Sequence, residues 1–335
     1  MSLRLIASMG ALATLIATTP VTTVSVSGQN TKAAPKTAAK KWTPPKTSWG
    51  DPDIQGSFSN TSENGTPFER PEQFEGRRLE DIKGEELLAI KREAQKRTVG
   101  NFEGPLHALE GWWQPDLNMD KGSQAWLVVD PPNGKIPPLT AEAQQRAAAR
   151  AQARRVSGRG PADSWEDRSL YDRCITRGLP GSMMPAIYGN GYQIVQGRGF
   201  VAITYEMIHE THIIPLDGRP HSGGTMRSHM GDARGRWEGD TLVVETTNFR
   251  DESVYRGANP ATLRLIERFT RIAPDKVKWS VTVDDPSTWT QPWTFSMPLT
   301  KDDSGLEVLE YSCHEGNLGL MNILSGARAD EEQSR

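Results

Sequence analysis

The stretch Arg236–Phe249, RWEGDTLVVETTNF, carries the signals of a β-hairpin. Arg236 and Trp237 lead into a turn at Glu238-Gly239-Asp240, and an alternating apolar run continues from Thr241. Alternation with a period of two is typical of a strand with one buried face, and a break at glycine and aspartate is typical of the turn between two such strands. The stretch therefore predicts two antiparallel neighbours.

The same pattern recurs on both sides of this hairpin. Further strand-length runs that end at turn residues are Tyr188–Val195, Phe200–Ile214, Leu263–Ile272, Val277–Val283 and Trp293–Leu299. No helical period separates them, so we expect a mostly β protein, an antiparallel meander closed as a barrel or folded as a sandwich. A small closed barrel can hold one small ligand in its interior.

The N-terminus predicts export. Arg4 is followed by the apolar or small residues Leu5–Val26 and by small residues up to Gly28, the pattern of a secretory signal peptide over residues 1–28. An uncleaved membrane anchor is the alternative, because the stretch is long enough to span a bilayer. The absence of a cysteine near the cleavage region argues against a lipoprotein. Residues 29–47, rich in Lys, Ala and Pro, predict a flexible tether.

Composition limits the partners. The formal charge is −3, and the one basic run, Arg146–Arg159, lies on an alanine-rich predicted helix, so we expect a solvated helix and no nucleic-acid binding. No later segment approaches the ~20 apolar residues that span a bilayer, so no stable membrane insertion is expected after signal removal. These features predict a periplasmic or secreted protein, and they carry no signal for an oligomeric state.

The region before the meander predicts helices and one short strand. Gly84–Arg97 and Ala141–Arg155 have helical patterns, and Gln124–Asp130 predicts a strand that ends at a Pro-Pro turn. We therefore expect residues 48–170 to cover the barrel with two helices, out of two or three peripheral helices in the chain. The barrel domain is expected over residues 171–326 and a tail over residues 327–335.

The two cysteines, Cys174 and Cys313, lie before the first strand and after the last run of the meander. In an exported chain they predict a disulfide that joins the two ends of the meander. The alternative is a catalytic thiol, because His314 follows Cys313 directly. Consecutive residues on a strand face opposite ways, and we expected Glu307–Ser312 to be a strand, so the disulfide is the preferred interpretation.

Several blocks of the sequence resemble a broad group of exported bacterial proteins. They are DPPNGKIPP (Asp130–Pro138), EMIHE (Glu206–Glu210), IPLDGRPH (Ile214–His221), GRWEGDTLVVE (Gly235–Glu245) and CHEGN (Cys313–Asn317). The resemblance covers most of the mature chain and implies export and a single mature unit. It implies no reaction and no catalytic residue. The meander is also similar, at the level of the fold, to lipocalin-like barrels, and fold does not give function.

Histidines and carboxylates mark the expected functional region. Five of the six histidines follow residue 200. Along the expected strand Phe200–Ile214, His209 shares the apolar face with Tyr205 and is expected to point inward, as a general base or acid or as a core histidine. The expected catalytic residues are His209, His221, Glu206 and Asp217.

The loop Asp217–Gly224 places a carboxylate, a guanidinium and an imidazole within five residues. Loops at a barrel mouth often carry function, although a solvated ion-pair network would have the same composition. The expected substrate-binding residues are Tyr192, Tyr205, Arg219, Arg227, His229, Arg234, Trp237 and His314. The aromatic residues among them would stack on a sugar or aromatic ring, or belong to the core.

No cofactor signature is present. Gly197-Arg198-Gly199 lacks the third glycine and the helix of a dinucleotide fingerprint, so we expect no organic cofactor. A divalent metal remains an alternative, with His221 and His229 joining His209 or His212 and with Glu210 or Asp217 as a third ligand. No spacing fixes that geometry.

Three functions fit these features. The first is an exported lyase or hydrolase that acts by His/carboxylate acid–base chemistry on a small polar-aromatic or carbohydrate-like molecule. The second is a carrier that binds a small molecule without turnover, and the third is a structural envelope protein. An enzyme would need His209 near a carboxylate or His221 and open volume.

Overall fold

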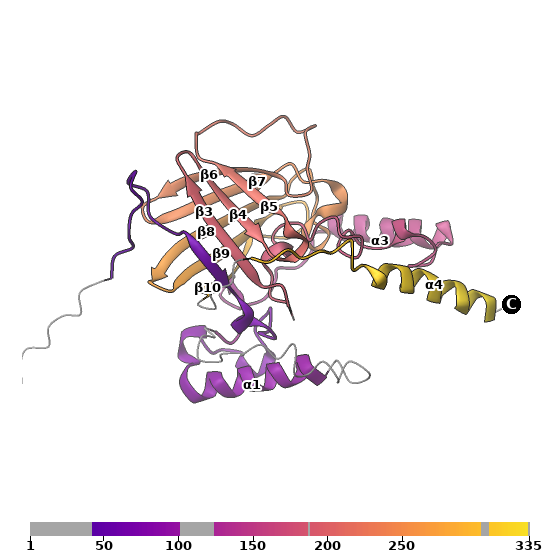
Figure 1. Cartoon of the computed structure of the whole chain (residues 1–335). Helices are drawn as coiled ribbons and strands as arrows, with labels where there is room; N and C mark the ends of the chain where they lie inside the picture. The colour runs from indigo at the N-terminus through magenta and orange to yellow at the C-terminus, as the bar shows by residue number, and fades with distance from the viewer. Residues whose placement is uncertain (1–41, 101–123, 187, 303–307, 334–335) are drawn as a thin grey trace, which may run out of the picture. The chain divides into compact units, whose positions relative to one another are not determined.

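The computed structural model describes residues 42–100, 124–186, 188–302 and 308–333 of the 335-residue chain (Figure 1). The chain divides into one unit over Met1–Lys41 and a second over Trp42–Arg335. The predicted signal peptide and most of the predicted tether lie in the first unit, outside the described residues. The account below concerns the second unit alone.

The strands of the described residues form one antiparallel sheet of ten. They are β1 (Gly56–Ser59), β2 (Val128–Asp130), β3 (Gly191–Gly197), β4 (Phe200–Tyr205), β5 (Thr211–Pro215), β6 (Asp232–Glu238), β7 (Thr241–Thr247), β8 (Arg264–Ala273), β9 (Lys276–Asp284) and β10 (Trp293–Lys301). The order along the sheet is β5-β4-β3-β1-β10-β9-β8-β7-β6, and β2 pairs with β10 beside this path. The prediction of a mostly antiparallel β protein with peripheral helices is confirmed.

Tight turns set the register of the hairpins. In the β6–β7 hairpin, Glu238 pairs with Thr241, and Gly239 in the two-residue turn has φ of 60°. In the β3–β4 hairpin, Gly197 pairs with Phe200, and Gly199 has φ of 82°. Left-handed turn residues match the twist of the flanking strands, and glycine adopts this conformation without a steric penalty. Both hairpins stand where the sequence predicted them.

The run Phe200–Ile214 is not one strand, and that prediction is wrong. β4 ends at Tyr205, the chain reverses through a short helical turn at Met207–His209, and β5 returns beside β4. Two non-glycine residues make the reversal, Ile208 with φ of 64° and His209 with φ of 61°. The backbone N–H of Tyr205 donates to the carbonyl of Glu210 at 2.9 Å and closes it. Residues on either side of the turn therefore follow two separate alternations.

The sheet is not closed into a barrel by hydrogen bonds, which corrects the predicted closure. Among the described residues, β5 and β6 are its two edges and no pairing joins them. Their side chains do approach each other: a Cβ on Gly235 of β6 would lie 2.7 Å from Cγ2 of Ile214 and 2.5 Å from Cδ2 of Leu216. Because glycine has no side chain, Ile214 of β5 and Leu216 just after it can pack directly on the backbone of β6.

One face of the curved sheet carries the main core. Inward positions on β8, β9 and β10 bring large rings together, with Trp279 and Phe295 in edge-to-face contact at 5.5 Å. Trp289 and Trp293 make a second such contact at 5.5 Å. Aromatic side chains bury 150–250 Å² each, so this cluster contributes much of the apolar burial that stabilises the fold.

Part of the region expected to cover the barrel belongs to the sheet. β1 lies between β3 and β10, and β2 pairs with β10. The helix α1 (Gly84–Gly100) packs Leu87 and Ile90 against a small second core that contains Trp126. The strand predicted over Gln124–Asp130 is present in part as β2, but pairing between distant segments has no local signal, so its place beside β10 was not predicted.

Two more helices complete the described elements. In α3 (Ala141–Ser157) the Thr140 side chain accepts the N–H of Ala143 at 3.1 Å, and Gly158 ends the helix with φ of 65°. The third, α4 (Leu318–Gln333), crosses the predicted boundary at residue 326. No helix among the described residues is long and apolar enough to cross a membrane.

The predicted disulfide is present. Cys174 and Cys313 are bonded, with their Cα atoms 5.7 Å apart and a sequence separation of 139. The described part of the predicted strand Glu307–Ser312 is not a strand, and Cys313 begins a turn. The bond links the chain just before β3 to the segment that follows β10, because both lie at one end of the sheet.

Candidate functional site

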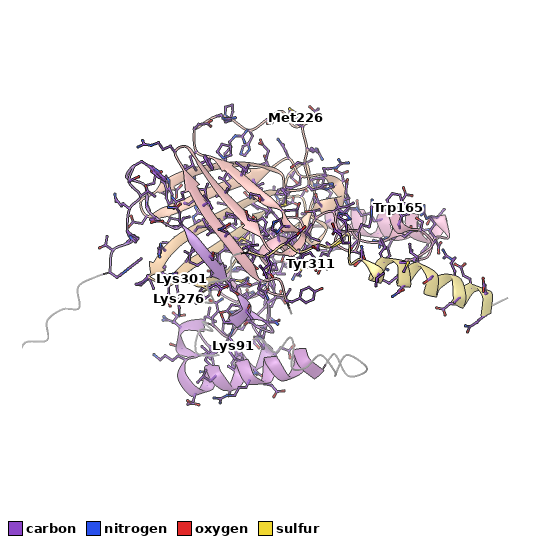
Figure 2. All side chains as sticks on the ribbon, in the orientation of Figure 1. Lys91, Trp165, Met226, Lys276, Lys301 and Tyr311 are labelled. Carbon is purple, nitrogen blue, oxygen red and sulfur yellow. A yellow bond between two sulfur atoms is a disulfide. The ribbon has the colours of Figure 1, made fainter. Side chains whose placement is uncertain are left out.

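The loop between β5 and β6 is held at its base by one carboxylate. Asp232, the first residue of β6, accepts the N–H of Ser222 at 2.7 Å, and its Oδ2 lies 3.2 Å from Nδ1 of His221. The amide of Asn248, after β7, donates to the carbonyl of Ser222 at 2.9 Å. The tip of the loop is free of such contacts and carries the exposed Met226, labelled in Figure 2.

His221 lies between two carboxylates. Besides Asp232 on its Nδ1 side, Oε1 of Glu245 is 3.7 Å from its Nε2. The side chain of Arg264 donates to Glu245 at 2.9 Å, and this hydrogen bond lowers the pKa of Glu245. Each ring nitrogen therefore faces a carboxylate oxygen, and the contact with Asp232 orients the ring.

Arg234 ties this group to the preceding loop. Its Nη1 pairs with Oδ1 of Asp232 at 2.6 Å, and its Nε donates to the carbonyl of Pro220 at 2.9 Å. Burial opposes ionisation of Asp232, but hydrogen bonds from Ser222 and Arg234 outweigh it, so its pKa is lowered. The expected residues His221 and Arg234 are therefore brought together through Asp232, a residue that connects them and was not among those expected.

The side chains of Asp217 and Arg219 pair with each other on an exposed part of the loop, and the carbonyl of Arg219 accepts from Nε of Arg234 at 3.2 Å. The hydrogen bonds from Arg219 lower the pKa of Asp217 to about 2. An exposed pair two residues apart is the solvated ion pair considered above as the alternative. Asp217, expected to be catalytic, faces solvent in this pair.

His209 does not point inward, and that expectation is wrong. It occupies the left-handed position of the β4–β5 turn and is exposed. The neighbouring expected residue Glu206 accepts the N–H of Gly191 at 2.8 Å and holds the ends of β3 and β4 together. The turn shifts the alternation, so the buried histidine is His212 on β5, and burial lowers its pKa to about 4.

The expected ring platforms Tyr192 and Tyr205 are core residues. Both are fully buried, and the hydroxyl of Tyr192 donates to Oδ1 of Asn60 at 3.1 Å. Burial raises the pKa of both phenols. Trp237 is half-buried against the core, and His314 is exposed in the turn after the disulfide. These four side chains do not gather at one place with the loop residues.

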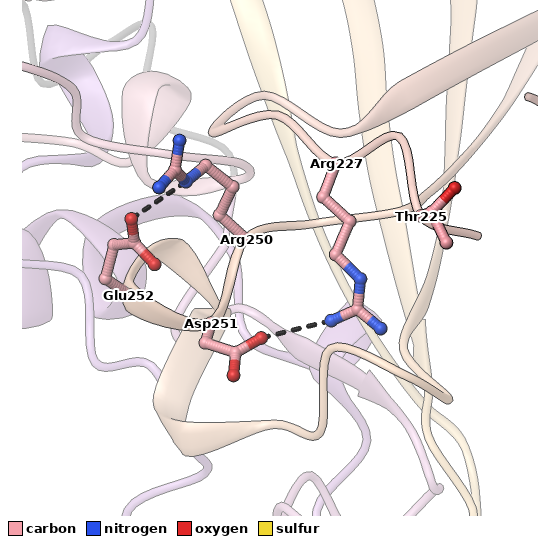
Figure 3. Close-up of a pocket in the computed structure, with 5 residues that line it drawn as sticks. All are labelled: Thr225, Arg227, Arg250, Asp251 and Glu252. Carbon is pink, nitrogen blue, oxygen red and sulfur yellow. Dashed lines mark hydrogen bonds and ion pairs between the residues drawn. The ribbon is translucent and has the colours of Figure 1, made fainter. Parts of the chain in front are cut away.

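A surface pocket of about 410 Å³ lies where two loops meet. Its lining is polar and consists of Thr225, Arg227, Arg250, Asp251 and Glu252 (Figure 3). Nη1 of Arg227 pairs with Oδ1 of Asp251 at 3.0 Å, and Nε of Arg250 pairs with Oε1 of Glu252 at 2.8 Å. Each guanidinium is thus held by a carboxylate from the loop that follows β7.

Both arginines keep donors free. Within the described residues, Nη2 of Arg227 and the two terminal nitrogens of Arg250 donate no hydrogen bond. His229 lies close by, and burial together with the charge of Arg250 lowers its pKa. Two guanidinium groups with free N–H groups and a weakly basic imidazole can accept an oxyanion.

The sequence singled out Arg227 and His229 but missed Arg250, Asp251 and Glu252. The missed residues follow β7 closely, where the charged run Arg250-Asp251-Glu252 was the available signal. The loops meet because Ser228 N–H donates to the carbonyl of Asn248 and Arg250 N–H donates to that of Ser228. Such pairing between separate loops cannot be read from local spacing.

A second missed feature is a carboxyl group inside the sheet. Glu267 on β8 is 1% exposed and accepts the indole N–H of Trp279 at 3.0 Å. Burial raises its pKa to about 7. The hydroxyl of Tyr205 and Nε2 of His212 are also buried and have no hydrogen-bond partner among the described residues. A glutamate in an alternating strand is usually on the exposed face, so the sequence alone did not indicate a buried Glu267.

The described residues contain no group of three or more His, Cys, Asp or Glu side chains that could hold a metal ion.

No family model and no curated protein matches the chain. Among solved structures, one similarity is to a secretary abundant heat soluble (SAHS) protein from Ramazzottius varieornatus, with 10% sequence identity and a TM-score of 0.24. The match covers 40% of this chain and 87% of that protein.

Proposed function

We propose that this chain is an exported protein that binds a small anionic molecule in the pocket of Arg227 and Arg250. The observation that carries the proposal is the presence of two guanidinium groups with free donors on one hollow of about 410 Å³. Pockets for small molecules are ~300–1,000 Å³, so the space suits a ligand of a few to a dozen non-hydrogen atoms.

The charge arrangement favours an oxyanion with other polar groups. Asp251 is largely exposed, so a ligand carboxylate or phosphate can replace it on Arg227 at little desolvation cost. Bidentate contact between a guanidinium and an oxyanion is among the stronger hydrogen-bonded pairs. Glu252 and Thr225 remain to bind hydroxyl or ammonium groups of the same molecule.

Binding without turnover fits the geometry better than catalysis. An acid–base enzyme was expected to use His209, which is exposed in a turn and has no carboxylate partner among the described residues. A lyase or hydrolase is the second candidate, supported by the 3.2 Å contact between His221 and Asp232. That candidate requires Nε2 of His221 to turn from Glu245 toward a substrate.

Export to the periplasm or the medium is part of the proposal. The N-terminal signal pattern and the resemblance to exported bacterial proteins support it, and the Cys174–Cys313 disulfide is typical of an oxidising compartment.

Calorimetric titration with citrate and with inorganic phosphate tests the binding site. We expect the double variant Arg227→Gln/Arg250→Gln to weaken binding of the better probe by about 10–100-fold, the loss of one or two charge-assisted hydrogen bonds. Arg236→Gln is the matched control, since Arg236 is in an exposed ion pair with Glu238 away from the pocket lining. Equal affinity in the parent and the double variant would contradict the proposal.

A further inference from the structure

Three tyrosines from separate segments gather beside the disulfide. The hydroxyl of Tyr311 donates to that of Tyr188 at 3.3 Å, and the hydroxyl of Tyr171 lies near both. Burial and the mutual hydrogen bonds raise the pKa of Tyr311, and burial raises the pKa of Tyr171. Figure 2 marks Tyr311 on the segment that leads to Cys313. None of these residues lines the Arg227/Arg250 pocket.

Arg177 adds an unpaired positive charge to this cluster. Its guanidinium carbon lies 5.3 Å from the centroid of the Tyr171 ring, in cation–π geometry. Its Nη1 is buried and has no hydrogen-bond partner among the described residues, and no carboxylate there pairs with it. Nearby Arg168, in contrast, pairs with Asp172 at 2.9 Å. A buried charged donor without an acceptor is costly, so an acceptor in addition to the described residues would stabilise this guanidinium.

The rings themselves offer flat apolar surface. Tyr188 is 47% exposed and Tyr171 is 36% exposed, although both belong to a hydrogen-bonded group. Tyr188 and Tyr311 are nearly parallel, with an angle of 15° and centroids 6.3 Å apart. Exposed, parallel rings with their hydroxyls turned to one place combine a stacking surface with donors at its edge.

We propose that Tyr171, Arg177, Tyr188 and Tyr311 form a binding site for a carboxylate carried on a ring. The carboxylate accepts from Arg177 and from a tyrosine hydroxyl, and the flat face of its ring stacks on Tyr188. A phosphate or sulfate ion would satisfy Arg177 but would leave the rings unused. Two kinds of molecule carry a carboxylate on a ring with a flat apolar face. One is an aromatic acid, and the other is a uronic acid sugar, whose C–H face also stacks on aromatic rings.

The full-length mature protein is titrated by calorimetry with 4-hydroxybenzoate, with glucuronate and with inorganic phosphate. We expect one ring carboxylate to bind at least about tenfold more tightly than phosphate, because stacking adds to the ion pair. The better of the two ring probes identifies the source, aromatic or sugar. Arg177→Gln should weaken that probe by about 10–100-fold, and Tyr188→Ala should weaken it while leaving the melting temperature unchanged.

Arg173→Gln is the matched control. Arg173 also stacks on an exposed ring, that of Trp165 at 4.6 Å, and its removal changes the net charge equally. The inference is overturned if neither ring carboxylate binds, if phosphate binds as tightly, or if Arg173→Gln has the same effect as Arg177→Gln. It is also overturned if the ring probe is lost in Arg227→Gln and kept in Arg177→Gln, a result that would support the proposed pocket instead.

Discussion

The indole N–H of Trp279 donates to the carboxyl group of Glu267 at 3.0 Å across neighbouring strands in the core of the sheet. Glu267 is fully buried, and burial raises its pKa to about 7. In the folded protein this carboxyl group is neutral below about pH 7, whereas in the unfolded chain it ionises at a much lower pH.

Stability is therefore expected to fall as the pH rises through the weakly acidic range. Since the folded pKa is raised, Glu267 stabilises the fold fully below its unfolded pKa, and this contribution is lost between about pH 4.5 and 7. The size of the loss is about 3 kcal/mol, because the folded pKa of about 7 lies above the usual 4.5 and each pH unit corresponds to roughly 1.36 kcal/mol.

Glu267→Gln should remove this part of the pH dependence. Urea unfolding at several pH values between 4 and 8 measures it, with Glu75→Gln at an exposed position as the control. The difference in unfolding free energy between parent and Glu267→Gln should move in favour of the variant as the pH rises. A difference that stays constant from pH 4 to 8 would show that Glu267 is ionised in the folded protein throughout.

Loss of one charge from the ion pair between Lys91 and Glu63 is expected to destabilise the fold more than loss of both charges. Nζ of Lys91 lies 2.7 Å from Oε2 of Glu63, and both side chains are almost fully buried. Lys91→Met should destabilise the protein by about 3–5 kcal/mol, because it removes the positive charge that compensates the buried carboxylate of Glu63. Combining it with Glu63→Gln should recover part of the loss. Thermal and urea unfolding of the three proteins measure both effects.

Arg78→Met serves as the surface comparison, since Arg78 pairs with Glu80 in solvent and its loss should leave the unfolding midpoint almost unchanged. If the double variant is no more stable than Lys91→Met, the two charges do not depend on each other.

Asp232 is expected to control the mobility of the loop that borders the pocket. Asp232→Ala removes the acceptor for Ser222 and the partner of His221 and Arg234. Limited trypsin digestion should then cut faster after Arg227, because proteolysis requires local opening of the chain. Mass spectrometry of the fragments locates the cut.

Asp217→Ala is the matched control for this digestion, since Asp217 pairs with its neighbour Arg219 on the exposed part of the same loop. Its digestion rate should equal that of the parent. Faster cleavage in both variants would mean that the loop responds to any lost carboxylate.

The hairpins were predictable because their turns use glycine and aspartate, whose preference for turns is local. The β4–β5 turn was missed because Ile208 and His209 adopt positive φ values, which side chains of their kind rarely do. That one reversal moved His209 to the surface and placed His212 inside. Contacts between distant segments pair Arg227 with Asp251 and insert β1 between β3 and β10. The local periodicity of a single sequence does not report such contacts.

The bond between Cys174 and Cys313 makes the chain from β3 to β10 a covalent ring. A protease that cuts the exposed loop near Met226 opens this ring but releases no fragment from it. The cut protein gains only the mass of one water and runs as one species until a reductant separates the two pieces. An exported protein with this connection can lose a peptide bond in this exposed loop and still keep both halves of its sheet in one covalent molecule.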